Sequence, residues 1–144
     1  MRYLLMVSHG TFAPGLHSVL NMLGSERPNI LSCSLQDGMG ADEYVANFKE
    51  TIAPITVEDE VVLLGDIIGG SPLTNALNTL TERGLLPHTV ALGGMNLPMA
   101  MTVSMGLDTM DLDALKAMAL TEARNGVDEL VVKLDDAAED EDDI

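Results

Sequence analysis

The chain has 144 residues, about the length of one domain, and its 23 acidic residues outnumber seven Lys and Arg for a formal net charge of −16. This charge argues against a nucleic-acid partner and against an anionic membrane surface, since both bind through basic residues. A single cysteine excludes an intramolecular disulfide, and without a long apolar run or a signal peptide we expect a soluble, cytoplasmic protein.

Short apolar runs alternate with amphipathic stretches along the chain. The apolar runs predict four buried strands, at residues 3–7, 30–35, 61–64 and 88–92. The amphipathic stretches between them predict three helices, at residues 16–23, 44–52 and 71–84. This alternation predicts an α/β fold with a doubly wound, mostly parallel sheet. In the flavodoxin-like strand order 2-1-3-4, strands one and three would be neighbours.

The pattern changes after the fourth predicted strand. Two helices follow in succession, at residues 97–105 and 111–125, and residues 129–134 then predict a fifth strand. Because two helices precede it, this strand could run antiparallel or pair with a second copy, which would make a homodimer and cover a sheet edge. We interpret residues 1–134 as one domain. Residues 135–144 carry seven acids and no base, which is typical of a disordered, solvated tail.

Glycine-rich loops follow the predicted strands and contain the candidate catalytic residues. His9 follows the first strand and Asp66 follows the third, so the 2-1-3-4 order would bring them within reach at one edge of the sheet. A carboxylate that accepts one ring N–H fixes the tautomer and leaves the other nitrogen as a nucleophile. The alternative is a structural role for each residue, with His9 packed as a polar side chain at the strand end and Asp66 as a turn or capping residue. Of the other histidines, His17 is expected on the surface and His88 in a structural position.

The same loops contain no Lys or Arg and no Walker-type glycine motif. A phosphate bound here would therefore be held by backbone amides, which helix N-termini expose. Ser71, followed by Pro72, is expected to be the N-cap of the third helix and could also donate to an anion. The sequence shows no cluster of Cys and His, so no metal or other cofactor is expected.

Three separated segments carry a family resemblance, namely VSHGTFAPGL at residues 7–16, LGDIIGGSP at 64–72 and GGMNLPM at 93–99. Together they resemble the IIA component of the mannose/fructose/sorbose family of the bacterial phosphoenolpyruvate:sugar phosphotransferase system. The three motifs occur in the family's order, and the resemblance extends to about residue 134.

The resemblance implies that His9 accepts a phosphoryl group from the histidine-containing phosphocarrier protein and passes it to a IIB component. IIB would be a separate chain, and a membrane sugar permease would be an indirect partner. Asp66 would orient His9, in a cytoplasmic homodimer that needs no metal. The resemblance also implies four phosphate-binding residues, which are Gly10, Thr11, Gly70 and Ser71.

Other classes remain open at this point. Small tetrapyrrole metal chelatases also have a short α/β domain with a His-Gly pair after the first strand, and there His9 would bind the incoming metal. A histidine phosphatase fits less well, because Ser8 stands where that family has an arginine. A non-catalytic interaction module is the third alternative.

Overall fold

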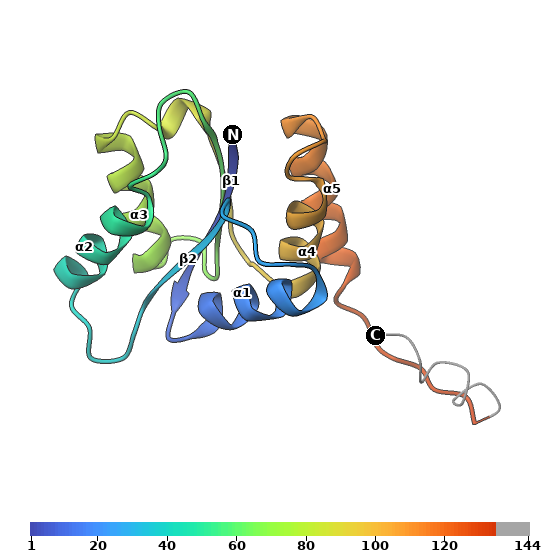
Figure 1. The fold of residues 1–144 in the computed structure, drawn as a ribbon. Helices are drawn as coiled ribbons and strands as arrows, with labels where there is room; N and C mark the ends of the chain where they lie inside the picture. The colour runs from blue at the N-terminus through green and yellow to red at the C-terminus, as the bar shows by residue number, and fades with distance from the viewer. Residues whose placement is uncertain (135–144) are drawn as a thin grey trace.

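A four-stranded parallel sheet forms the centre of the molecule in the computed structural model, which describes residues 1–134 (Figure 1). Its order is β2-β1-β3-β4, and each neighbouring pair is parallel, as the alternating pattern predicts. The strands are β1 (Arg2–His9), β2 (Ile30–Leu35), β3 (Glu60–Gly65) and β4 (Thr89–Leu92). This is the flavodoxin-like arrangement, and its switch point lies between β1 and β3, where ligands of open α/β sheets bind.

Helices cover both faces of the sheet, and Figure 1 shows them as two layers on either side of the strands. One apolar cluster joins α2 and α3 to the sheet, and a second joins α1, α4 and α5 to its other face. The helices are α1 (Phe12–Leu23), α2 (Ala41–Thr51), α3 (Ser71–Glu82), α4 (Leu97–Gly106) and α5 (Leu112–Asn125), with a short 3₁₀ helix, η1 (Leu86–His88), before β4.

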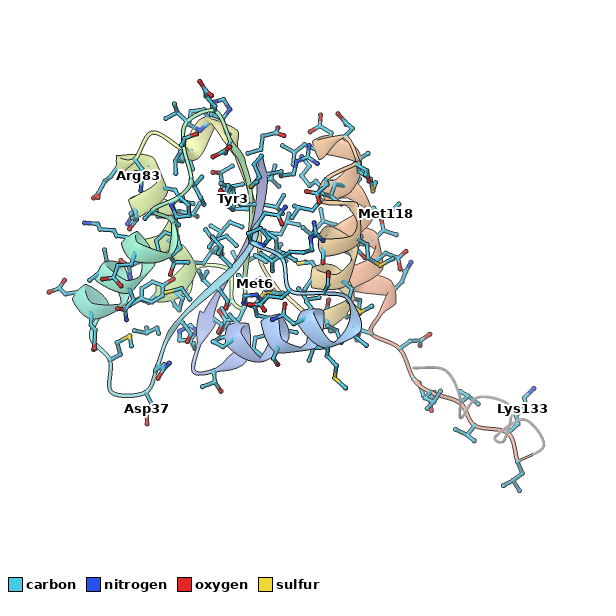
Figure 2. All side chains as sticks on the ribbon, viewed as in Figure 1. Tyr3, Met6, Asp37, Arg83, Met118 and Lys133 are labelled. Atoms are coloured by element: carbon cyan, nitrogen blue, oxygen red, sulfur yellow. The ribbon has the colours of Figure 1, made fainter. Side chains whose placement is uncertain are left out.

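The central strand β1 has an uninterrupted apolar run because helices cover both faces of the sheet. Side chains of a strand alternate between the two faces, and here both faces are covered. Tyr3, Leu5 and Val7 belong to the cluster with α2 and α3, whereas Leu4 and Met6 belong to the cluster with α1, α4 and α5. Figure 2 shows Tyr3 and Met6 among the side chains between the helical layers. All five are buried, so β1 is held rigidly by both layers.

Several element boundaries differ from the sequence prediction. The strand β1 continues to His9, so this residue ends the strand instead of lying in the loop after it. The helix α1 begins at Phe12, four residues earlier than its apolar stripe predicts. The strand β4 begins at Thr89, because His88 closes the preceding 3₁₀ turn, donating its N–H to Leu85.

The predicted fifth strand over residues 129–134 is not formed within this chain. Residues 127–134 adopt neither helix nor strand, and in Figure 1 they lead away from the C-terminal end of α5. They meet no strand edge there, so strand pairing is not available to them. Pairing of this segment with a second copy stays a prediction, and the predicted acidic tail at 135–144 lies outside the described residues. Every helix of residues 1–134 is too short or too polar to span a bilayer.

Candidate functional site

The candidate site lies where β1 and β3 end, next to each other at the carboxyl edge of the sheet. Their register pairs Val7 with Gly65, so that Asp66 leaves β3 level with the last residues of β1. Both strands are held between the two helical layers, which makes their ends a rigid base for side chains. His9 and Asp66, predicted to approach each other, are in direct contact.

The contact is made through one oxygen of the carboxylate. Asp66 Oδ2 accepts the backbone N–H of His9 at 2.9 Å and lies 2.9 Å from Nδ1 of its ring. The other oxygen, Oδ1, accepts the N–H of Ile67 at 2.9 Å. The Asp66 side chain is 14% exposed and the His9 side chain 45% exposed. The carboxylate is therefore enclosed, while the imidazole remains reachable from solvent.

These hydrogen bonds determine the charge of Asp66 and the tautomer of His9. Burial alone would raise the pKa of Asp66, but the hydrogen bonds from the His9 backbone and ring and from Ile67 outweigh it and hold the pKa below its ordinary value. An ionised carboxylate can only accept, so Nδ1 of His9 carries the proton that is shared with Asp66. In the neutral ring, Nε2 then has a free electron pair, which is what a nucleophilic imidazole requires.

A glycine turn after Asp66 fits closely against the imidazole. Gly70 donates its N–H to the Ile67 carbonyl at 3.1 Å, and Gly69 between them has a φ of +80°, which L side chains rarely adopt. Gly70 itself has an ordinary φ of −73°. A Cβ at Gly70 would, however, lie 3.0 Å from Cε1 of His9. The absence of a side chain at Gly70 thus gives the ring its space.

The four residues implied as phosphate contacts divide into two pairs. Gly10 donates its N–H to the Leu35 carbonyl at 2.8 Å, and Gly70 donates its N–H to the Ile67 carbonyl within the turn. Within the described residues, the N–H groups and hydroxyls of Thr11 and Ser71 donate to no protein acceptor. Thr11 and Ser71 lie at the N-termini of α1 and α3, where free N–H groups favour an anion. The amides of Gly10 and Gly70 thus already have acceptors within the chain, and a phosphate-binding role for these two glycines stays a prediction.

Ser71 does not cap α3, contrary to the prediction. The N-cap position is taken by Gly70, and Ser71 is the first residue of the helix. Its hydroxyl accepts the side-chain N–H of Asn75 at 2.9 Å, because both lie on the same side of the first turn. The hydroxyl proton of Ser71 is consequently still free to be donated.

Two buried residues that support the site escaped the sequence analysis. Ser8 is fully buried, and its hydroxyl accepts the N–H of Ala13 at 2.7 Å, which caps α1 from the strand before it. Tyr44 on α2 donates its hydroxyl to the Pro72 carbonyl at 2.8 Å and so holds the first turn of α3. Burial raises the pKa of Tyr44, so it remains a neutral donor. The role of Ser8 could have been suspected from the sequence, because a serine shortly before a helix often caps it. The Tyr44 contact could not, because it depends on how α2 and α3 pack.

The other two histidines lie apart from this pair. His17 is partly buried, with Nδ1 2.8 Å from the hydroxyl of Ser32 on β2, so it is less exposed than the predicted surface position implies. Its burial lowers its pKa, against an opposing effect of Glu26. His88 is exposed, in the turn before β4.

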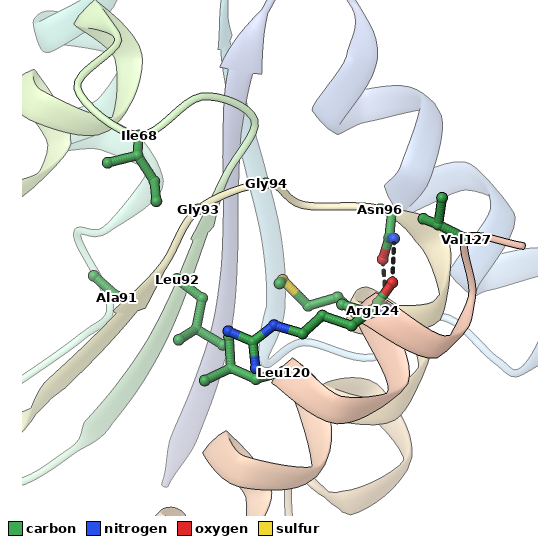
Figure 3. A pocket seen from close by; sticks show the side chains of 11 residues that line it. Ile68, Ala91, Leu92, Gly93, Gly94, Asn96, Leu120, Arg124 and Val127 are labelled. Atoms are coloured by element: carbon green, nitrogen blue, oxygen red, sulfur yellow. Dashed lines mark hydrogen bonds between the residues drawn. The ribbon is translucent and has the colours of Figure 1, made fainter.

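Two hollows flank the site on opposite sides. A depression of about 330 Å³ lies on the β2 side of His9 and is lined by Leu35 and residues 36–39. A groove of about 640 Å³ lies beyond the turn after Asp66, between the end of β4 and α5 (Figure 3). Among residues 1–134, no three His, Cys, Asp or Glu residues are grouped so that they could hold a metal ion.

Comparison with known proteins identifies the family. A family model described as the PTS system fructose IIA component matches residues 3–120, which include most of the chain and all of the sheet except Arg2. The chain belongs to this family. The matched region runs from β1 into α5 and includes both His9 and Asp66.

Individual relatives agree with this assignment. The IIA-family chain is 27% identical over 95 residues to the PTS system fructose-specific EIIA component of Bacillus subtilis, a match that covers 66% of this chain and 63% of that protein. Among solved structures, component EIIA from Streptococcus agalactiae is similar with a TM-score of 0.76 and 21% identity, covering 90% of this chain and 97% of that one. The IIA protein associated with the fucose utilization operon of Streptococcus pneumoniae has a TM-score of 0.74 and 26% identity, covering 89% and 92%. Fold and family are thus both those of a IIA component.

Proposed function

We propose that this IIA-family chain carries a phosphoryl group on Nε2 of His9, which it receives from the histidine-containing phosphocarrier protein and passes to a IIB component. The observation that supports this most directly is the hydrogen bond from Nδ1 to Asp66. It leaves Nε2 as the free nitrogen of a half-exposed ring. The membrane sugar permease would be an indirect partner, and the chain would work in the cytoplasm without a metal or nucleic acid.

The transfer requires one bond to form as another breaks. The electron pair of Nε2 attacks the phosphorus of the donor's phosphohistidine, a new P–N bond forms, and the old P–N bond returns its electrons to the donor ring. Positive charge then develops on the His9 ring, and the ionised Asp66 stabilises it through the Nδ1–H hydrogen bond. Transfer to IIB reverses these events, with the P–Nε2 electrons returning to His9.

The polar groups around His9 are suited to brief retention of the phosphoryl group. Thr11 and Ser71 offer hydroxyl and N–H donors at two helix N-termini. The strand-end loops contain no Lys or Arg that would bind the group tightly. A carrier must release its phosphoryl group to the next protein, so weak, neutral donors serve it better than a cationic clamp.

The test is phosphorylation with phosphoenolpyruvate, the first enzyme of the relay and the phosphocarrier protein, followed by intact mass. Wild-type protein should gain one phosphoryl group, and His9→Ala should gain none. His17→Ala and His88→Ala are matched controls and should be phosphorylated like the wild type. The bond should be labile in acid and stable in base, as a P–N bond is. Stoichiometric phosphorylation of His9→Ala, or an acid-stable product, would contradict the proposal.

We further propose that the chain forms a homodimer in which residues 129–134 of one copy occupy the groove beside β4 of the other. β4 pairs only with β3 among the described strands, so one edge of it is free. The segment is rich in exposed apolar side chains, with Leu130 83% and Val131 70% exposed. The groove is mainly apolar, and it contains the Arg124 side chain, which could pair with an acid of the incoming segment (Figure 3). An added strand would cover both the sheet edge and these side chains.

A further inference from the structure

The turn that follows Asp66 has two sides, and only one of them faces His9. On that side Asp66 binds the ring and Gly70 lies against Cε1. Between them the turn contains Ile67 and Ile68, whose side chains are 56% and 79% exposed. The hydrogen bonds of the site do not explain why two large apolar side chains are exposed beside a reactive group.

The side chain of Ile68 extends to the other side of the turn and rests on Gly93. A Cβ added at Gly93 would overlap Cγ1 of Ile68 and lie 3.0 Å from its Cδ1. Gly93 follows β4, and both residues line the groove that Figure 3 shows. Ile68 therefore connects the turn at the end of β3 with the loop at the end of β4. This contact lies within one chain and exists whether or not the groove is filled.

The turn needs such a connection because its backbone is intrinsically free. Gly69 and Gly70 lie within it, and glycine restricts the chain least of all residues. One N–H of the turn, that of Ile67, is bound to Asp66 Oδ1, so a displaced turn would pull on the carboxylate that holds His9. A displaced Gly70 would also release the ring at Cε1.

We infer that Ile68 is a positioning residue for phosphoryl transfer: by resting on Gly93 it fixes the turn, and the fixed turn keeps Asp66 and Gly70 in place around the His9 imidazole. The inference rests on the proposed phosphoryl transfer for its kinetic consequence. Its structural consequence, the orientation and tautomer of the His9 ring, is independent of any partner. Ile68 acts through these neighbours and needs no contact with the phosphoryl group.

The test compares four variants of the full-length chain, Ile68→Ala, Ile68→Val, Gly93→Ala and Ile67→Ala. Ile68→Ala removes the contact with Gly93, and Gly93→Ala displaces Ile68 from the opposite side. Ile68→Val retains both γ carbons and should restore much of the effect. Ile67→Ala is the matched control, because it removes a similar exposed side chain from the same turn without touching Gly93. Circular dichroism checks that each variant is folded.

Two measurements distinguish a role of Ile68 in positioning His9 from a role in docking the phosphocarrier protein. Nitrogen-15 NMR of labelled histidine measures the share of the Nδ1–H tautomer of His9 in the protein alone. Phosphorylation kinetics measure kcat and KM for the phosphocarrier protein separately. For Ile68→Ala and Gly93→Ala, we expect a smaller share of the Nδ1–H tautomer and a kcat about five-fold lower, with KM unchanged. Ile68→Val should lie close to the wild type, and Ile67→Ala should keep the wild-type tautomer.

An unchanged tautomer in Ile68→Ala, together with a raised KM and a normal kcat, would overturn the inference and make Ile68 a docking contact only. An unchanged tautomer and unchanged kinetics would overturn it as well. Should the wild type accept no phosphoryl group, the proposed function fails, and the tautomer alone then decides the positioning role of Ile68.

Discussion

Asp66 is the residue on which the chemistry of the site depends, because its two oxygens accept three N–H groups. Two of these come from His9, so one carboxylate fixes both the backbone and the ring of that residue. The third comes from Ile67 and orients the carboxylate itself. Both oxygens of Asp66 act only as acceptors, so a substitution that replaces either oxygen by a donor disturbs at least one of the three contacts.

Asp66→Asn tests this dependence. The NH2 group of asparagine would face either the N–H of Ile67 or the two N–H groups of His9. In the second case Nδ1 could no longer be held as the protonated nitrogen. We expect phosphoryl acceptance to fall by roughly ten- to a hundred-fold, with the fold retained. Rapid-quench phosphorylation measures the rate. Asp37→Asn, at the exposed depression on the β2 side, is the control and should react at the wild-type rate.

The lowered pKa of Asp66 also has a consequence for stability. The folded-state pKa is below the unfolded one, so ionised Asp66 stabilises the fold at pH values above the unfolded pKa. This stabilisation is lost as the pH falls through the lowered folded pKa. Urea unfolding measured at pH values from 6 down to about 3 should show a steeper loss of stability for the wild type than for Asp66→Asn. Parallel curves for the two proteins would contradict this assignment.

At the scale of elements, the strand ends and helix N-termini bring the site together. β1 and β3 deliver His9 and Asp66, and α1 and α3 begin within a few residues of them. Gly70 links the start of α3 to the end of β1, since it is both the N-cap of α3 and a neighbour of the His9 ring. Its lack of a side chain therefore matters to His9 more than to α3.

Gly70→Ala should move the imidazole without disturbing the helix. Its backbone angles suit alanine, but the new Cβ would lie 3.0 Å from Cε1 of His9. Gly40→Ala is a closely matched control, because Gly40 is also an N-cap with extended backbone, and a Cβ there would meet nothing within 4 Å. We expect both variants to show similar thermal unfolding, and only Gly70→Ala to accept the phosphoryl group more slowly. Equal rates for the two variants would show that the ring tolerates the added carbon.

The sequence allowed the elements and the central pair to be predicted, because both follow from local patterns. Continuous apolar runs identify buried strands, and the carboxyl ends of parallel strands meet at one edge, which brings His9 to Asp66. The use of the Gly10 amide by Leu35 and the contact of His17 with Ser32 could not be predicted in this way. Both depend on how β2 lies against β1 and α1, and no local pattern contains that information.

At the scale of the whole molecule, the C-terminal segment at residues 127–134 has apolar side chains that the described chain does not bury. Leu130, Val132 and Leu134 are exposed, and within residues 1–134 one edge of β4 has no partner strand. The proposed homodimer accounts for both. The predicted strand over 129–134 would then form only between copies, which explains why its sequence has strand character although a single chain gives it no partner.

Leu130→Asp tests the homodimer, because it introduces a charge into the apolar segment. We expect light scattering to give a dimer mass for the wild type at micromolar concentration and a monomer mass for the variant. Val57→Asp, at an exposed apolar residue outside the groove, is the control and should remain a dimer. Deletion of residues 135–144 should also leave the dimer intact. A monomeric wild type, or an unchanged dimer in Leu130→Asp, would contradict the proposed pairing.

The position of the phosphoryl group on the imidazole tests the central claim most directly. Phosphorylated wild-type protein, labelled with nitrogen-15 in histidine, can be examined by NMR for coupling between phosphorus and each ring nitrogen of His9. Because Asp66 holds Nδ1–H, we predict that phosphorus is bonded to Nε2 and that Nδ1 keeps its proton. A phosphoryl group on Nδ1 of His9, or on another residue, would contradict the account.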